Sequence, residues 1–533
     1  PMDHQLYADR TKQLIHQAEI LSRKYTIAVT NPPYMNKYDR KLKEYIYSYY
    51  PDSKADLFSV FIEVLLNLLT NDGVMGMVTP DSWMFLSGQV QLRERLVNEA
   101  HIATMIHLGN GAFPHVVVST TAFTIAKGKS LTSGDYIRDI LGNEKSKEDL
   151  ALLGVADESH DSRYRASNSD FDVFPGKIIA YWASNAMKRI YSFGNVENVA
   201  TVITGMTIGD NNKYMRRWYE ISNLRLGLGL TEFHPDKYWI PYSKGGERRN
   251  WYGNNDFVVN WSQKNNFNRP KTTCSHLYLK KALTWPFLTS GTFSARSLDQ
   301  GFLWDVAGSP IFFEDDEVMH YTLGFLCSKI ANHILKITNP TLNTQAIDIA
   351  KLPLKIDQAH LNEVIDIVLR SRELSKMDWD SFEASWDFEK HPLLPSSSET
   401  KLEDTYTAWD ELSTTRWNTL KANEERLNEI FIEVYGMQDE LTPEVEDKYV
   451  SVRKADMTRE AKSLLSYFVG VIFGRYSLDR PGLNYAGGEW DGSSQHALVD
   501  ADNVVPIMDS EFYTDDIIKK LRDFLTTVYG DST

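Results

Sequence analysis

A chain of 533 residues is too long for one ordinary core, and its length predicts two to four domains. Its 42% apolar and 24% charged residues are typical of a soluble globular protein. The longest apolar run, residues 464–473, is far shorter than the roughly 20 residues of a membrane span, which excludes a transmembrane protein. Only Cys274 and Cys327 occur, too few for a disulfide framework or a cysteine-rich zinc site, so a reducing cytoplasm is expected. The chain begins with Pro1 and shows no signal peptide, which suggests a fragment of a longer protein.

The net charge of -15 argues at first against binding to nucleic acid, because phosphates require a basic surface. The acidity is concentrated in residues 361–533, where 18 Lys and Arg face 35 Asp and Glu. Residues 196–360 hold 18 basic and 15 acidic residues, a net charge of +3. The central part of the chain therefore remains a candidate for DNA contact.

The first 126 residues alternate between β-branched runs and helical periodicity, which predicts an α/β fold with a mostly parallel sheet and helices on its faces. This strand-helix-strand alternation is expected to form part of a Rossmann-like sheet. The predicted elements are a helix over 5–24, a buried strand over 26–30, a helix over 55–70, a strand over 74–79, a helix over 88–99, a strand over 102–107 and an extended pair around 116–126.

The texture of the chain changes twice further on. Residues 128–170 are polar and predict a linker or surface excursion. From about 196, turn residues and aromatic residues become frequent, which predicts a β-rich mixed module, and beyond 361 the chain is helical and acidic. We therefore expect three domains, 1–195, 196–360 and 361–533.

The most informative stretch is Asn31-Pro32-Pro33-Tyr34, at the carboxyl end of the first predicted strand. The exocyclic amine of adenine is a poor nucleophile, and a site that methylates it must accept hydrogen bonds from that amine. Asn31 offers a side-chain carbonyl, and Pro32 offers a backbone carbonyl in a frame stiffened by two prolines. Tyr34 offers a face on which a base can stack. A plain turn is the competing interpretation, and the preceding strand favours chemistry because ligands bind at the carboxyl edge of parallel sheets.

This stretch resembles the (Asn/Asp)-Pro-Pro-(Tyr/Phe) motif of amino-methyltransferases that use S-adenosyl-L-methionine. Later segments resemble the gamma class of DNA adenine methyltransferases, in the same order along the chain. The resemblance implies that Phe61 lies near the cofactor adenine together with Asn31, and that Phe113 of Gly111-Ala112-Phe113-Pro114 stacks on a base flipped out of duplex DNA. Core packing is the alternative for Phe61. The quoted segments are residues 56–63, residues 72–80 and residues 111–114.

The sequence departs from that family in one respect. The family's Gly-rich cofactor loop precedes the proline motif, and no such loop occurs in residues 1–30. Gly205 and Gly209 lie in the wrong order and context. The expectation is that this chain alone binds S-adenosyl-L-methionine poorly and methylates little. The resemblance involves no metal, and the histidines form no cluster with ligand spacing.

Residues 204–211 and 339–343 resemble the opening and closing of target-recognition domains, which present basic side chains to DNA. The alternative for each candidate is that its charge is exposed to solvent and serves only solubility. The candidates for DNA contact are Arg216, Arg217, Lys244, Arg248, Arg249 and Arg269.

Three further segments, residues 378–383, 435–442 and 473–482, resemble the large adenine methyltransferases of BREX phage-defence systems. That resemblance runs through essentially the whole chain. It implies N6-adenine methylation of one strand of an asymmetric site in double-stranded DNA, and partnership with other BREX proteins. An amino-methyltransferase that acts on protein and a non-catalytic DNA-binding specificity subunit remain alternatives.

Overall fold

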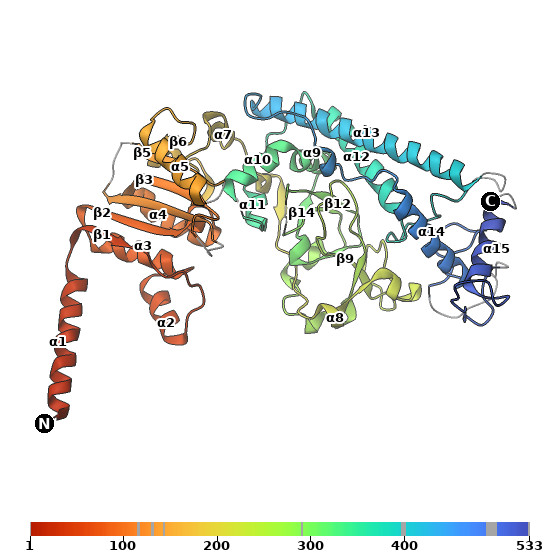
Figure 1. Ribbon diagram of the computed structural model, residues 1–533, viewed down its shortest axis with the longest axis horizontal. Helices are drawn as coiled ribbons and strands as arrows, with labels where there is room; N and C mark the ends of the chain where they lie inside the picture. The colour runs from red at the N-terminus through yellow and green to blue at the C-terminus, as the bar shows by residue number, and fades with distance from the viewer. Residues whose placement is uncertain are drawn as a thin grey trace. The chain divides into compact units, whose positions relative to one another are not determined.

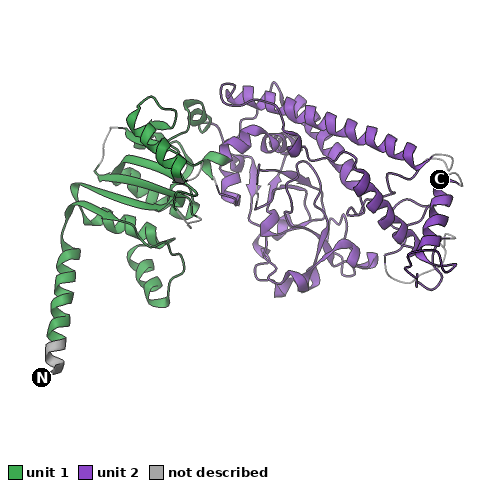
Figure 2. Cartoon of the chain, in the orientation of Figure 1, with its two compact units in different colours: residues 1–192, 336–340 green, residues 193–335, 341–533 purple. Residues whose placement is uncertain are grey.

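The computed structural model describes residues 2–113, 118–128, 133–141, 144–288, 291–339, 341–395, 401–486 and 498–530. The chain divides into two compact units (Figure 2). The first unit comprises Pro1–Ser192 and Lys336–Pro340, and the second comprises Phe193–Leu335 and Thr341–Thr533. Residues 196–360 and 361–533 thus lie mainly in one unit, and their division into two domains stays a prediction.

A six-stranded sheet forms the centre of the first unit (Figure 1), with the strand order β1-β2-β4-β3-β5-β6. β1 pairs in parallel with β2, and β3 pairs in parallel with β5. β4 runs antiparallel between β2 and β3, so the mixed α/β fold is confirmed but the sheet is less parallel than its sequence predicts. The strands are β1 (Tyr25–Thr30), β2 (Leu69–Pro80), β3 (Ala100–Gly109), β4 (Thr120–Lys127), β5 (Gly134–Arg138) and β6 (Arg163–Ala166).

Three helices of the first unit follow the predicted positions, and its other described helices are additions. α3 and α4 pack against strands of the sheet, and the short amphipathic helix α2 is absent from the sequence prediction. The helices are α1 (Met2–Ser22), α2 (Arg40–Tyr49), α3 (Leu57–Leu68), α4 (Val90–Glu99), α5 (Glu144–Ala156), α6 (Asn168–Phe171) and α7 (Asn185–Ile190).

Two sequence predictions need correction in this unit. The predicted linker at 128–170 contains β5, α5 and β6, which extend the sheet at one edge. The strand predicted as buried, β1, lies at the other edge, where Ile27 is 70% and Val29 is 76% exposed. Ile27 and Val29 are two residues apart and so share one face of β1.

The second unit contains two four-stranded sheets around an aromatic core, so the predicted β-rich mixed texture is confirmed. Asn195 bridges to Pro353, so the two ends of the segment 196–360 meet. The sheets are β13-β9-β10-β8 and β12-β11-β14-β7. Their strands are β7 (Ala200–Val202), β8 (Met215–Arg217), β9 (Trp239–Ser243), β10 (Phe257–Asn260), β11 (Ala282–Thr284), β12 (Arg296–Leu298), β13 (Leu303–Trp304) and β14 (Pro310–Phe313).

Helices dominate the rest of the second unit, as predicted. α12 packs against α9 and α13. Among the described helices, none combines the length and the hydropathy that crossing a membrane requires. The helices are α8 (Asn211–Tyr214), α9 (Asp316–Cys327), α10 (Lys329–Thr338), α11 (Ala346–Ala350), α12 (Leu361–Asp380), α13 (Leu402–Tyr435), α14 (Met457–Ile472) and α15 (Ile517–Tyr529).

Candidate functional site

The segment Asn31–Tyr34 directly follows β1, as its sequence predicts. In the parallel register Thr30 lies beside Met77, so the chain leaves β1 at the same edge where β2 ends at Pro80. Pro32 is buried, whereas Asn31 and Tyr34 are exposed. The corner is thus fixed through a buried proline while its two polar side chains stay accessible.

Tyr34 ties this corner together. Its hydroxyl lies 3.3 Å from Asn31 Oδ1 and 3.3 Å from the carbonyl oxygen of Val78, the acceptors available to it. Its ring packs edge-on against Phe58, with centroids 6.2 Å apart, and remains 39% exposed. Burial raises the pKa of the Tyr34 hydroxyl above 10.0, so the group stays a donor at neutral pH. Asn31 Oδ1 keeps a second lone pair for another donor.

Asp56 holds the chain that follows the corner. Its carboxylate caps α3 by accepting from Phe58 N at 3.4 Å, and it also accepts from Met35 N at 3.0 Å. Leu57 N donates to Met35 O at 2.9 Å. One N-cap residue therefore fixes both the start of a helix and the exit from the proline corner.

Two cavities lie at the corner. The first, of about 410 Å³, involves Asn31 and the strands β1, β2, β3 and β4. The second, of about 490 Å³, involves Tyr34, Lys37 and Phe58. Both volumes fall in the range of small-molecule sites. A larger cavity of about 830 Å³ lies in the second unit, where Lys376 is already paired with Asp380 and Asp387.

A buried polar network lies at the same edge, and sequence reasoning missed it. Asp81, the first residue after β2, accepts hydrogen bonds from Ser119 Oγ and from His107 Nε2, the latter at 2.9 Å. Asp81 N donates to Ser119 O at 3.1 Å. The other ring nitrogen of His107 lies 3.2 Å from the Tyr181 hydroxyl. The network joins the ends of β2 and β3 to the segment before β4.

The two predicted aromatic residues occupy different environments. Phe113 is 41% exposed and follows β3 at the carboxyl edge, where a stacking residue is expected. Pro114 and residues 116–117 of the predicted extended pair lie outside the described residues. Phe61 is partly exposed on α3, and it is the neighbouring Phe58 that lines the second cavity with Tyr34. The roles of Phe61 and Phe113 remain predictions.

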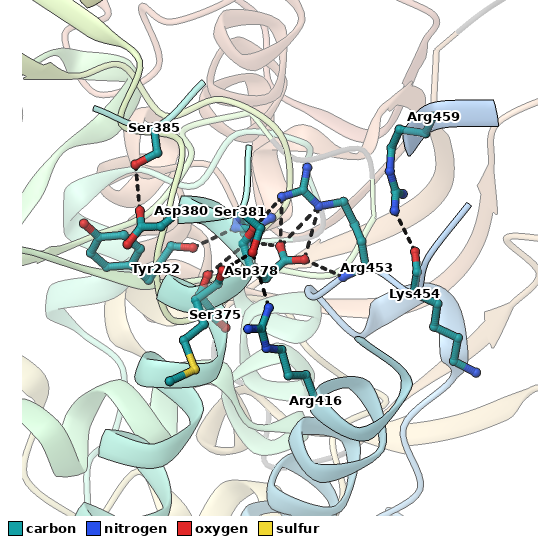
Figure 3. A network of polar contacts seen from close by, with 12 residues as sticks. Tyr252, Ser375, Asp378, Asp380, Ser381, Ser385, Arg416, Arg453, Lys454 and Arg459 are labelled. Atoms are coloured by element: carbon teal, nitrogen blue, oxygen red, sulfur yellow. Dashed lines mark hydrogen bonds and ion pairs between the residues drawn. The ribbon is translucent and has the colours of Figure 1, made fainter. Parts of the chain in front are cut away.

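All six basic candidates for DNA contact donate hydrogen bonds within the protein. Arg249 is 8% exposed and donates to Asp378 at 2.7 Å. Arg453 donates to the same carboxylate at 3.0 Å (Figure 3). The guanidinium of Arg248 donates to Tyr449 O and Thr292 Oγ1, both at 2.7 Å. The remaining pairs are Lys244 with Asp305 at 2.8 Å and Arg217 with Asp256 at 2.7 Å.

The other two candidates differ in exposure. Arg216 is half-buried and donates to the backbone oxygens of Asn212 and Met215. Arg269 is exposed, and its neighbours Lys213 and Lys264 are exposed as well. Ring contacts of Phe267 with Tyr214 and Trp261 bring the segments of these three cations together. We call Lys213, Lys264 and Arg269 the basic surface.

Backbone packing explains why residues 205 and 209 are glycines. A Cβ on Gly205 would lie 2.0 Å from the carbonyl oxygen of Asp305, and Gly209 has a φ of +90° beside Asn268. Close backbone approach and a left-handed conformation both require glycine. These contacts account for the pair without a cofactor.

Comparison with known proteins first identifies a class of protein that part of this chain resembles. Residues 3–113, which contain the proline corner, match the Eco57I restriction-modification methylase family. The Type IIL restriction-modification enzyme MmeI, solved in complex with DNA, aligns with a TM-score of 0.48 at 12% identity, over 82% of this chain and 57% of that one.

Two curated relatives narrow the class. The adenine-specific methyltransferase PglX of Lacticaseibacillus casei (strain Zhang) is 38% identical over 97% of this chain and 45% of its own length. The adenine-specific methyltransferase BrxX of Escherichia coli O9:H4 (strain HS) is 32% identical over the same shares. The resemblance to adenine-specific methyltransferases is therefore confirmed over nearly the whole chain, which spans under half the length of these relatives.

Proposed function

We propose that this chain is the target-base and DNA-recognition part of a site-specific N6-adenine DNA methyltransferase. The observation that carries the proposal is the accessible pair Asn31 and Tyr34 on a proline corner at the carboxyl edge of two parallel strands. The likeness to PglX and BrxX, both named adenine-specific methyltransferases, supports the reaction class.

The proposed chemistry follows from the acceptors at the corner. Asn31 Oδ1 and the Pro32 carbonyl oxygen accept the two N–H bonds of the adenine amine, which localises the nitrogen lone pair. Tyr34 donates to Asn31 Oδ1 and so orients the amide with its oxygen towards the base. The exposed ring faces of Tyr34 and Phe113 would stack on the flipped base.

S-adenosyl-L-methionine is the methyl donor we propose, and it would supply an electrophilic methyl group on a sulfonium. The cavity of about 410 Å³ beside Asn31 has the size and the mostly apolar lining of a cofactor site. Asn31 would then lie between donor and acceptor, and Phe61 would contact the cofactor adenine.

The proposed biological setting is phage defence. The resemblance of the chain to BREX methyltransferases leads us to propose that this protein marks host DNA and acts with other BREX proteins in the cytoplasm. Residues 196–360 would form the target-recognition domain, and residues 1–195 and 361–533 the flanking domains. Arg269 is the predicted DNA contact whose exposure best suits that role, ahead of Arg216, Arg217, Lys244, Arg248 and Arg249.

The decisive test maps methylated adenines in host DNA by single-molecule sequencing, with the gene intact, deleted or mutated. Asn31→Ala should abolish the mark with normal protein levels, because an acceptor of the amine is lost. Asn71→Ala is the matched control, since Asn71 lies near the opposite end of β2 and is also exposed. Persistence of the mark in Asn31→Ala would refute the role assigned to this residue.

A further inference from the structure

The short helix α2 (Arg40–Tyr49) presents tyrosine rings to solvent. Ile46 is 1% exposed and anchors one face of the helix. Around the rest of the helix, Tyr45 is 52%, Tyr47 is 48% and Tyr49 is 67% exposed. Three large rings left outside a core within five residues indicate a binding surface, since tyrosine stabilises a fold mainly when it is buried.

These rings are organised. Tyr45 and Tyr49, one helical turn apart, have centroids 4.8 Å apart, and Tyr45 lies 6.1 Å from Tyr50. The surface therefore offers adjacent aromatic faces held on a helix. Such an array is suited to a ligand with several flat groups in succession.

Cations flank the rings. Lys43 Nζ, which precedes Tyr47 in the sequence, and Lys54 Nζ, which follows it, each lie 5.4 Å from the centroid of the Tyr47 ring. Residues 37–54 contain five Lys and Arg against three Asp and Glu. One of those acids, Glu44, is paired with Arg40 at 2.9 Å, and another, Asp39, caps the helix. The lysines thus give the surface a positive character.

The surface is continuous with the candidate site. Lys37 lines the cavity that contains Tyr34. The Tyr38 hydroxyl donates to Lys54 O at 3.3 Å, and Asp56 accepts from Met35 N, so the segment is tied to the corner at both ends. A strand whose base enters that cavity would pass next to α2.

We propose that Tyr45, Tyr47 and Tyr49, with Lys43 and Lys54, bind the unpaired stretch of the DNA strand that flanks the flipped base. This inference rests on the proposed function and adds a second contact to it. Extruding a base breaks pairing and stacking locally, and exposed aromatic faces with interleaved cations are the means by which proteins hold unpaired strands. A strand repeats base and phosphate at short intervals, which matches alternating rings and ammonium groups.

The test measures binding of the full chain to a fluorescent duplex with a central unpaired bubble, by anisotropy. Tyr45→Ala/Tyr49→Ala should weaken binding by about tenfold or more, because each lost stacking contact weakens binding severalfold. Tyr45→Phe/Tyr49→Phe should bind like the original chain, since the ring faces remain. Tyr7→Ala is the control, because Tyr7 is 67% exposed on α1 of the same unit.

Two further measurements locate the contact. Lys43→Gln/Lys54→Gln should reduce the dependence of DNA affinity on salt. The slope of the logarithm of the association constant against the logarithm of salt concentration should fall by about 1.4, at about 0.7 per phosphate contact on a single strand. Bromodeoxyuridine placed in the bubble should cross-link on irradiation to a tyrosine of α2, identified by peptide mass spectrometry. These readouts decide the matter even where the alanine variant fails to fold.

The outcomes separate this inference from the proposed function. Unchanged affinity of the alanine variant, with cross-links elsewhere, overturns the α2 surface while DNA binding by the chain stands. Absence of any DNA binding by the original chain overturns both. Loss of affinity in alanine but not phenylalanine variants, with cross-links on α2, supports the inference.

Discussion

At the scale of single residues, the proline corner combines a rigid backbone with accessible acceptors. The position of Asn31 and Tyr34 after a strand could be predicted from sequence, because the motif consists of four consecutive residues. The network of Asp81, Ser119 and His107 could not, because it joins three segments that only the sheet brings together. Phe58 was missed for a related reason: helical spacing does not say which of two nearby aromatic residues faces a cavity.

Tyr34 allows a residue-scale prediction. Tyr34→Phe keeps the ring and loses one hydroxyl donor that lies 3.3 Å from each of two acceptors, so methylation should fall by no more than about tenfold, or about 1.4 kcal/mol. Tyr34→Ala removes the stacking face and should cost at least about tenfold more. Methylated fractions from host DNA measure both variants. Equal losses in the two variants would show that the hydroxyl, rather than the ring, matters.

At the scale of elements, the sequence predicted helices with strong apolar periodicity and strands rich in β-branched residues. It did not predict helices and strands that carry many polar residues. α2 was missed because tyrosines and lysines surround a single buried isoleucine, Ile46, which obscures its apolar periodicity. β5 and β6 were missed because short strands at a sheet edge carry charged residues such as Asp135, Arg163 and Arg165. Ion pairs between these strands stabilise their pairing, as apolar contacts do in central strands.

The end of α12 supports an element-scale prediction about stability. Asp378 is 2% exposed and accepts from both Arg249 and Arg453. Burial alone would raise the pKa of Asp378, but the two guanidinium groups hold it below 3.8. Asp378→Asn should therefore destabilise the second unit by about 3–5 kcal/mol, because it leaves the buried Arg249 and the partly buried Arg453 without their counterion. Urea unfolding at neutral pH measures this.

The same carboxylate predicts a pH dependence. A lowered pKa in the folded state means that the stabilisation is complete above 3.8 and is lost as the pH falls through the lower folded value. Unfolding midpoints of the original chain and Asp378→Asn should thus converge only as the pH falls below 3.8 and through the lowered pKa of the folded state. The control Asp387→Asn, in a pair that is about half exposed, should cost at most about 1 kcal/mol at neutral pH. Equal effects of the two substitutions would contradict the assigned role.

At the scale of the whole molecule, the distribution of charge matters more than its sum. Residues 206–281 hold 13 Lys and Arg against 6 Asp and Glu, although the chain as a whole carries -15. The sequence predicted which third of the chain is least acidic. It could not predict that Arg249 would be buried in an ion pair while Lys264 stays exposed, because burial depends on packing with distant helices.

The basic surface defines a whole-molecule prediction. Lys264→Gln/Arg269→Gln should lower the salt slope of duplex DNA binding by about 2, at about one unit per lost phosphate contact. Lys448→Gln, an exposed lysine paired with Glu446 in the acidic third, should leave the slope unchanged. Titrations at several salt concentrations measure both. An unaltered slope in the double variant would exclude this surface from the DNA contact.

The uncovered edge strand has a practical consequence for handling the isolated chain. Ile27 and Val29 lie two residues apart on β1, next to unpaired backbone groups, which is the arrangement that recruits another strand. Concentrated preparations should therefore oligomerise through the β1 edge of the sheet, and light scattering should show an apparent mass that rises with protein concentration. A lysine in place of Val29 would act as a gatekeeper and keep the sample monodisperse.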